Sequence, residues 1–129
     1  MQKILILALL MGQLFALTAN KQNIIKLQSQ NIPIIDIRTP SEWKQTGVIP
    51  NALKITFFTK KGINPKFLYQ LQKNNISKTS KFAIICRTGH RSKIATKILK
   101  DNGYIHTIDL EGGMFRLFKS LLKGLNHGK

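Results

Sequence analysis

The fold of this chain is decided by one stretch, Phe82-Ala83-Ile84-Ile85-Cys86-Arg87-Thr88-Gly89-His90-Arg91-Ser92. Its first four residues are apolar, as in a short strand that is covered on both faces. From about residue 90 to 102, apolar side chains recur at helical spacing. A glycine and two arginines lie around the junction. The stretch therefore predicts a buried strand, an anion-holding loop and a helix N-terminus, with the only cysteine of the chain at the start of the loop.

Strand and helix patterns alternate along the rest of the chain. We expect strands at 32–37, at the end of 48–55, at 82–86 and at 105–110. Helices are expected at 21–30, from Pro40 to a stop at Gly47, at 65–74, at about 90–102 and at 114–125, the last with an apolar stripe of Phe115, Phe118, Leu121 and Leu122. Thr39 and Glu42 have the spacing of a capping box, and Gly103 is expected to cap its helix. This alternation predicts an α/β fold, a parallel sheet flanked by helices on both faces.

The N-terminal segment is typical of a secretory signal peptide. Lys3 precedes an apolar run from Ile4 to Leu10, which Gly12 interrupts well short of the ~20 residues of a spanning helix. We expect residues 1–19 to be the signal peptide, cleaved after Ala19, and residues 20–129 to be one exported, periplasmic domain with no stable membrane span after cleavage. An uncleaved N-terminal membrane anchor is the alternative.

The chain is strongly basic, with 21 Lys and Arg against 5 Asp and Glu and a formal net charge of +16. Such a charge suggests nucleic acid or an anionic membrane surface as a partner. The lysines are scattered, however, and no aromatic platform accompanies them, so nucleic acid is not expected. His106 and His127 lack ligand-spaced partners, and we expect neither a metal nor a cofactor. The charge would draw small anionic substrates to the surface.

Cys86 is the candidate nucleophile. A free thiol has a pKa of about 8.5, and converging loop amides, a helix N-terminus and the neighbours Arg87 and Arg91 all favour its thiolate. The alternative is a buried structural cysteine. Flanking cations favour the reactive interpretation, because a cysteine that only packs gains nothing from them.

Four motifs together carry a resemblance to a known family. They are Ile35–Trp43, Gly47–Ala52, the loop Cys86–Ser92, and Leu110–Gly113. In this order they resemble a single-domain rhodanese, a sulfurtransferase of the thiosulfate:cyanide type. The resemblance implies a rhodanese-like fold in which Cys86 takes sulfane sulfur from a donor such as thiosulfate or polysulfide, becomes a persulfide and passes the outer sulfur to a thiophilic acceptor.

The resemblance also implies the substrate-binding residues and partners. The backbone amides of residues 87–91 would cradle the transferred sulfur, and two side chains would bind anionic donor groups, so the predicted set is Arg87, Thr88, Gly89, His90 and Arg91. The expected partners are a small anionic sulfur donor and a thiol or cyanide acceptor, with a protein sulfur acceptor as a further option. Where the family commonly has glycine, this chain has Asn51.

Two other functions stay open at this point. One is a rhodanese-fold sulfur carrier or protein-binding module without independent turnover. The other is a phosphatase or arsenate reductase, which is less favoured because those enzymes place one more residue between cysteine and arginine than the four found between Cys86 and Arg91. Asp36 and Arg38, two apart at a strand end, are expected to form a structural ion pair rather than catalytic groups.

Overall fold

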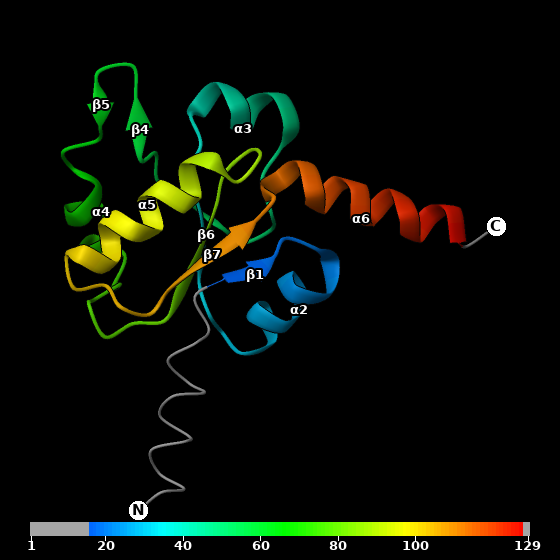
Figure 1. The fold of residues 1–129 in the computed structure, drawn as a ribbon, viewed down its shortest axis with the longest axis horizontal. Coiled ribbons are helices and arrows are strands. Elements are labelled where there is room, and N and C mark those ends of the chain that lie inside the picture. The colour runs from blue at the N-terminus through cyan, green and yellow to red at the C-terminus, as the bar shows by residue number, and fades with distance from the viewer. Residues whose placement is uncertain (1–15, 128–129) are drawn as a thin grey trace, which may run out of the picture.

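The structure, a computed structural model, describes residues 16–127 as an α/β architecture (Figure 1). Its elements in chain order are β1 (Ala16–Thr18), α2 (Lys21–Ser29), β2 (Ile34–Asp36), α3 (Pro40–Thr46), β3 (Leu53–Lys54), β4 (Phe58–Thr59), β5 (Gly62–Ile63), α4 (Phe67–Lys73), β6 (Phe82–Ile85), α5 (His90–Asp101), β7 (Thr107–Glu111) and α6 (Gly113–His127). No helix among these residues is both long enough and apolar enough to cross a membrane.

A five-stranded parallel sheet forms the centre of the fold, in the order β1-β7-β6-β2-β3. The strand β6 lies between its two neighbours in register, with Ile84 opposite Ile35 of β2 and Asp109 of β7. All four residues of β6 are buried. The parallel sheet predicted from the sequence is confirmed, and the cysteine-bearing strand is its middle strand.

Helices cover both faces because neighbouring side chains of a strand point to opposite sides. Ile35 and Ile84 join the core cluster that contains Phe67 of α4 and Leu99 of α5. Ile34 and Ile85 join the second cluster, which is completed by α2 and α6 through Ile24, Leu27, Met114 and Leu117. A strand with two apolar faces therefore needs helices on each, as the continuous apolar pattern predicts.

The helix ends follow the predicted sequence signals. The Thr39 backbone N–H donates to Glu42 Oε1 at 3.2 Å at the start of α3, and Gly47 follows its last residue with a φ of +76°. After α5, the N–H of Gly103, whose φ is +95°, donates to the Lys100 carbonyl at 3.0 Å, closing the helix as a C-terminal glycine does.

Asn51 has a φ of +67°, in the left-handed region that glycine adopts without strain. Asparagine tolerates this region better than most residues because its short side chain bonds locally. Asn51 can therefore replace the glycine that is common in the family and still form the turn between α3 and β3.

Three of the described strands, β1, β4 and β5, were not predicted. The hairpin β4–β5 pairs Phe58 with Ile63 outside the main sheet. The edge strand β1 pairs with β7, with Leu17 opposite Leu110, and the N–H of the fully buried Ala19 donates to the Glu111 carbonyl at 2.8 Å. Cleavage after Ala19 would remove β1 from the sheet. Residues 1–15 of the predicted signal lie outside the described residues.

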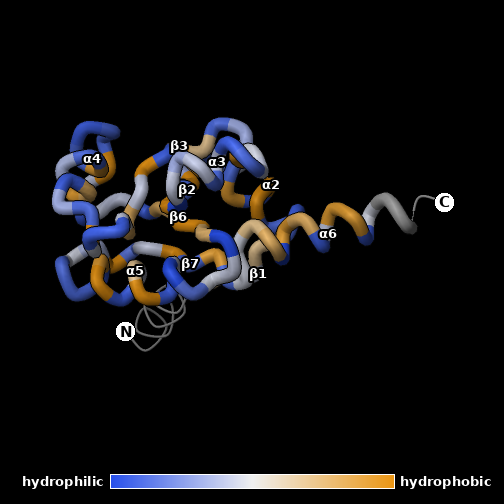
Figure 2. Tube along the Cα trace, turned by 90° about the horizontal axis from the view of Figure 1, so that it is seen from above, coloured by the Kyte–Doolittle hydropathy of each residue, from blue (hydrophilic) through white to orange (hydrophobic). Residues whose placement is uncertain are grey.

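The last helix forms where it was predicted, and the structure shows which of its faces is buried. Met114 and Leu117 pack into the core, whereas the stripe predicted from the sequence, Phe115, Phe118, Leu121 and Leu122, is exposed. The C-terminal half of α6 extends beyond the sheet, which leaves Leu121 and Leu122 without a covering layer (Figures 1 and 2). Phe115 and Phe118, nearer the start of the helix, face a pocket beside α3. The apolar pattern predicted a helix but not which side faces the body.

Candidate active site

Cys86 directly follows β6, at the carboxyl end of the central strand. Ligand sites of open parallel sheets lie at this edge, outside the ends of the strands. The Cys86 residue is only 1% exposed, and Gly89 and the start of α5 come next in the chain. Gly89 has a φ of +102°, which turns the loop so that its own N–H points back at the sulfur.

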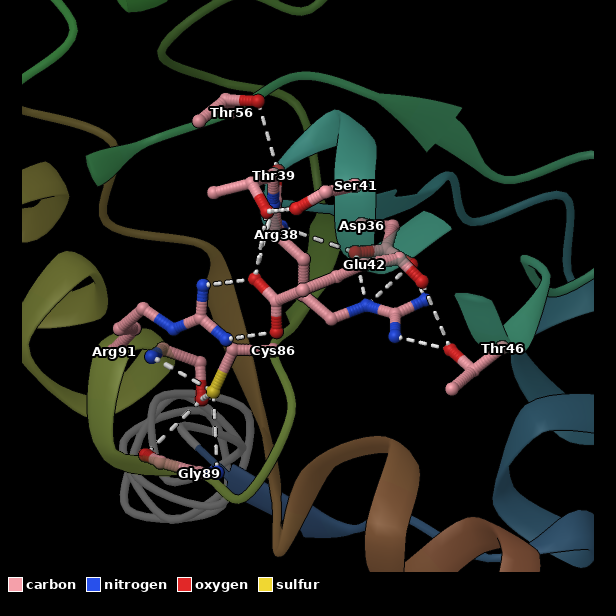
Figure 3. Close-up of polar contacts among 11 residues, drawn as sticks. Asp36, Arg38, Thr39, Ser41, Glu42, Thr46, Thr56, Cys86, Gly89 and Arg91 are labelled. Carbon is pink, nitrogen blue, oxygen red and sulfur yellow. Dashed lines mark hydrogen bonds and ion pairs between the residues drawn. The ribbon is translucent and has the colours of Figure 1, made fainter. Parts of the chain in front are cut away.

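Hydrogen bonds converge on the Cys86 sulfur (Figure 3). The Gly89 N–H donates to Sγ at 3.1 Å, and the Ser92 N–H, in the first turn of α5, donates at 3.4 Å. The thiol is 3.4 Å from Ser92 Oγ, to which it donates, and that hydroxyl donates onward to the Gly89 carbonyl at 3.3 Å. The loop thus presents backbone donors from a helix N-terminus to one sulfur atom, an arrangement that stabilises negative charge there.

The first turn of α6 holds the other side of the loop. The Met114 N–H donates to the Cys86 carbonyl at 2.9 Å, and the Phe115 N–H donates to the Arg87 carbonyl at 3.0 Å. A Cβ added to Gly113 would lie 2.5 Å from the Cys86 carbonyl oxygen. Gly113, the first residue of α6 and part of the fourth motif, therefore lets the helix approach the loop backbone this closely.

Arg91 is paired with an acidic residue that is 49 positions away. Its guanidinium donates to both Glu42 oxygens, at 2.6 and 2.7 Å (Figure 3). The hydrogen bonds from Arg91 are the main cause that lowers the pKa of Glu42 to about 2, and the same bonds raise the pKa of Arg91. This pair ties α5 to α3. Sequence reasoning missed it, because Glu42 was already accounted for by helix capping.

Asp36 and Arg38 form the predicted structural ion pair, 2.8 Å apart and almost fully buried. Arg38 also donates to Thr46 Oγ1 at 2.6 Å and to the Gly47 carbonyl at 2.7 Å. A buried pair with this many partners is satisfied. It fixes the end of α3, and with it the carboxylate of Glu42, beside the loop.

The other predicted binding residues lie on two sides of the loop. The exposed Arg87 lines a pocket between α3 and α6 that is bounded by Gln45, Met114, Phe115 and Phe118, among others.

Thr88, Gly89 and His90 line a second pocket, together with Lys93 and Arg116. The structure therefore does not gather all five predicted residues in one cavity.

Asp109 of β7 also lines the second pocket, and sequence reasoning missed it. It is 7% exposed, and its Oδ1 has no hydrogen-bond partner among the described residues. Burial raises the pKa of the Asp109 carboxyl, while the nearby Ser92 hydroxyl acts in the opposite direction. In the sequence, Asp109 lies between the apolar residues Ile108 and Leu110, so nothing distinguished it from an ordinary residue of a strand.

Comparisons with known proteins agree with this geometry. A model of the rhodanese-like domain family matches residues 19–119. A sulfurtransferase of Allochromatium vinosum is 34% identical over 86 residues, which cover 67% of this chain and 71% of that protein. The adenylyltransferase and sulfurtransferase UBA4 of Saccharomyces cerevisiae is 33% identical over 85 residues, covering 64% of this chain but only 19% of the yeast protein.

A solved structure gives the same result at the level of the fold. The crystal structure of a rhodanese-like domain protein from Staphylococcus aureus has a TM-score of 0.61 and 29% identity, and the match covers 79% of this chain and 89% of that one. The family match spans four of the five strands of the sheet, β2, β3, β6 and β7, together with the cysteine loop and the first turns of α6. The chain therefore belongs to the rhodanese-like family, as a single rhodanese-like domain.

Proposed function

We propose that this protein is a rhodanese-type sulfurtransferase that carries sulfane sulfur on Cys86. The observation that carries the proposal is the buried Cys86 Sγ, which receives the Gly89 and Ser92 backbone N–H groups at the N-terminus of α5. Such fixed donors favour an anionic sulfur both as the attacking thiolate and as the persulfide. The sulfurtransferase names among the relatives support the same chemistry.

The proposed reaction has two displacement steps. The Cys86 thiolate attacks the outer sulfur of thiosulfate, a sulfur–sulfur bond forms to Cys86, and sulfite leaves with the electron pair of the broken bond. Cyanide or a thiolate then attacks the outer sulfur of the persulfide, and the electron pair of that bond returns to Cys86. Polysulfide would serve as donor in the same way, with a shorter polysulfide as the leaving group.

The two loop arginines receive different roles in this proposal. Arg91 holds the loop against α3, since Glu42 already balances its charge through two hydrogen bonds. Arg87 is exposed beside the pocket between α3 and α6 and is free to bind the anionic part of a donor. Thr88, Gly89 and His90 are proposed to surround the outer sulfur with the loop backbone.

The decisive experiment is sulfur loading. The protein is incubated with thiosulfate, polysulfide or a small persulfide, and its intact mass is measured. We expect the mass of one added sulfur on the wild type, its release by dithiothreitol, and no addition on Cys86→Ser. Absence of the adduct with all three donors would refute the proposal.

Turnover separates the enzyme from its alternatives. Continuous formation of thiocyanate from thiosulfate and cyanide is expected of an enzyme, whereas a sulfur carrier without independent turnover would load once and stop. Hydrolysis of a chromogenic phosphate ester, lost in Cys86→Ser, would instead favour the phosphatase alternative.

We further propose that the protein is exported, on the basis of the N-terminal sequence alone. N-terminal sequencing of the native protein is the test. A chain that starts near Asn20 would support export with cleavage, and a chain that starts at Met1 would favour the membrane-anchored alternative.

A further inference from the structure

The exposed side of α6 carries two parallel stripes. Phe115, Phe118 and Leu122 form an apolar stripe at the spacing i, i+3, i+7, and they are 57%, 36% and 60% exposed. A cationic stripe runs beside it at the same spacing, made of Arg116, Lys119 and Lys123, all exposed. The two stripes are in contact, since Lys119 Nζ lies 5.0 Å from the centre of the Phe115 ring. The buried Met114 and Leu117 hold the helix to the body on another side.

No acidic side chain in α6 balances these cations. The helix has no Asp or Glu in its sequence, and the chain has only five. Of those five, Asp36 and Asp109 are buried, Glu42 is paired with Arg91, and Asp101 is on α5. The fifth, Glu111, lines a pocket together with Arg116 but not with Lys119 or Lys123. The helix therefore presents positive charge next to exposed apolar area, on the part of the molecule that extends beyond the sheet (Figure 2).

We propose that this face of α6 docks on an anionic lipid surface. A helix with an apolar stripe beside a basic stripe lies in the plane of the membrane interface, where apolar side chains reach the acyl boundary and cations stay at the level of the phosphates. The net charge of +16 adds long-range attraction to such a surface. The high charge then has a second physical role, besides the attraction of small anionic substrates.

A concave region at the side of α6 fits one lipid headgroup. It is lined by the three cations Arg116, Lys119 and Lys123, by Leu122, and by the polar residues Asn20 and Ser120. In the uncleaved chain Thr18, at the end of β1, lines it as well. Cations and amide or hydroxyl donors around one apolar side chain match a phosphate that is attached to an acyl chain.

Other partners fit this face less well. Protein interfaces are depleted in lysine relative to the rest of the surface, while this face is bordered by it. Single-stranded nucleic acids stack on aromatic rings, but the most exposed apolar residue here is the aliphatic Leu122. The two stripes run along one helix, and this linear arrangement suits a fluid planar partner.

The test is co-sedimentation of the full chain with vesicles of phosphatidylglycerol and phosphatidylcholine, against vesicles of phosphatidylcholine alone. We expect Leu122→Glu to lower the partition coefficient on anionic vesicles at least ten-fold, because a charge replaces the inserted side chain. The double variant Lys119→Gln/Lys123→Gln should lower the partition coefficient on the order of ten-fold, since each cation near an anionic surface contributes to the binding free energy. Circular dichroism and urea unfolding verify that each variant is folded.

Matched controls lie outside α6. Ile105→Glu changes an apolar residue that is 58% exposed, and Lys81→Gln/Lys97→Gln removes the same net charge from other exposed positions. Both should bind nearly as the wild type does. Every variant keeps the apolar run Ile4–Leu10, so binding through that run alone would be the same in all of them.

Three results would overturn the proposal. The first is equal vesicle binding by wild type, Leu122→Glu and the double lysine variant. The second is self-association of the wild type without lipid that Leu122→Glu abolishes, which would assign the stripe to a second copy of the chain. The third is nucleic acid binding that the lysine variant loses while its vesicle binding is unchanged.

Discussion

Replacement of Glu42 by glutamine tests how the cysteine loop is held. The substitution removes the charge that pairs with Arg91 but keeps an oxygen that can accept the Thr39 N–H at the start of α3. The fall of the Glu42 pKa from 4.5 to about 2 corresponds to roughly 3 kcal/mol in favour of the charged form. Because the Glu42 and Arg91 side chains are 19% and 28% exposed, solvent screening reduces the expected loss of unfolding free energy to about 1–2 kcal/mol.

The lowered pKa of Glu42 also predicts how the stability difference between wild type and Glu42→Gln changes with pH. A carboxyl whose pKa is lower in the folded state than in the unfolded state stabilises the fold, and this contribution is complete above the unfolded-state pKa. The contribution is lost as the pH falls through the folded-state pKa. The difference in unfolding free energy between wild type and Glu42→Gln should therefore be constant near neutral pH and shrink from pH 4.5 towards pH 2. Urea unfolding at a series of pH values measures it.

A control variant and a double-mutant cycle complete the test. Glu111→Gln removes the same charge from an exposed carboxylate outside the pair and should change stability by less than about 0.5 kcal/mol. A double-mutant cycle that compares Glu42→Gln, Arg91→Gln and the double variant with the wild type isolates the interaction energy between Glu42 and Arg91. A coupling energy near zero, or a Glu42→Gln difference that persists unchanged at pH 2, would refute the conclusion that this pair ties α5 to α3.

Three further predictions concern the close approach of α6, the buried carboxyl and the donor site. Gly113→Ala should lower the unfolding free energy by about 2–4 kcal/mol, because a Cβ there meets loop backbone at 2.5 Å and φ is +63°. Gly124→Ala, at a position in α6 with open space around it, should raise the unfolding free energy by about 0.5–1 kcal/mol. Equal effects of Gly113→Ala and Gly124→Ala in urea unfolding would contradict the close approach of α6 to the loop. Burial raises the pKa of Asp109, so its charge opposes folding as the pH rises. Asp109→Asn should therefore be more stable than the wild type at neutral pH in urea unfolding, and the difference should vanish as the pH falls below 3.8. Arg87→Ala should raise the KM for thiosulfate about five- to ten-fold with little change in kcat, while Lys97→Ala should leave both unchanged in steady-state assays.

Local sequence patterns were sufficient to predict most of the fold and the position of Cys86 at the end of a buried strand. The continuous apolar run of residues 82–85 required cover on both faces, so a central parallel strand followed from residue types alone. Caps such as Thr39 with Glu42, and Gly103, act within a few residues of chain, and they could be predicted because their partners are close in sequence. The same holds for Cys86 and Gly89, which are three positions apart.

Contacts between distant segments were decided only by the tertiary structure. Glu42 carries the same local capping signal whether or not an arginine 49 positions later reaches it. The strand β1 exists because β7 offers it an edge, although its three residues have no strand signal of their own within an apolar leader-like segment. The face that α6 buries was likewise set by the sheet, because an amphipathic helix with apolar side chains on two sides can pack on either one. Sequence by itself determined the strand, the loop and the thiol, whereas the positions of Glu42, Asp109 and the exposed stripe depended on packing between segments that the chain brings together only when it is folded.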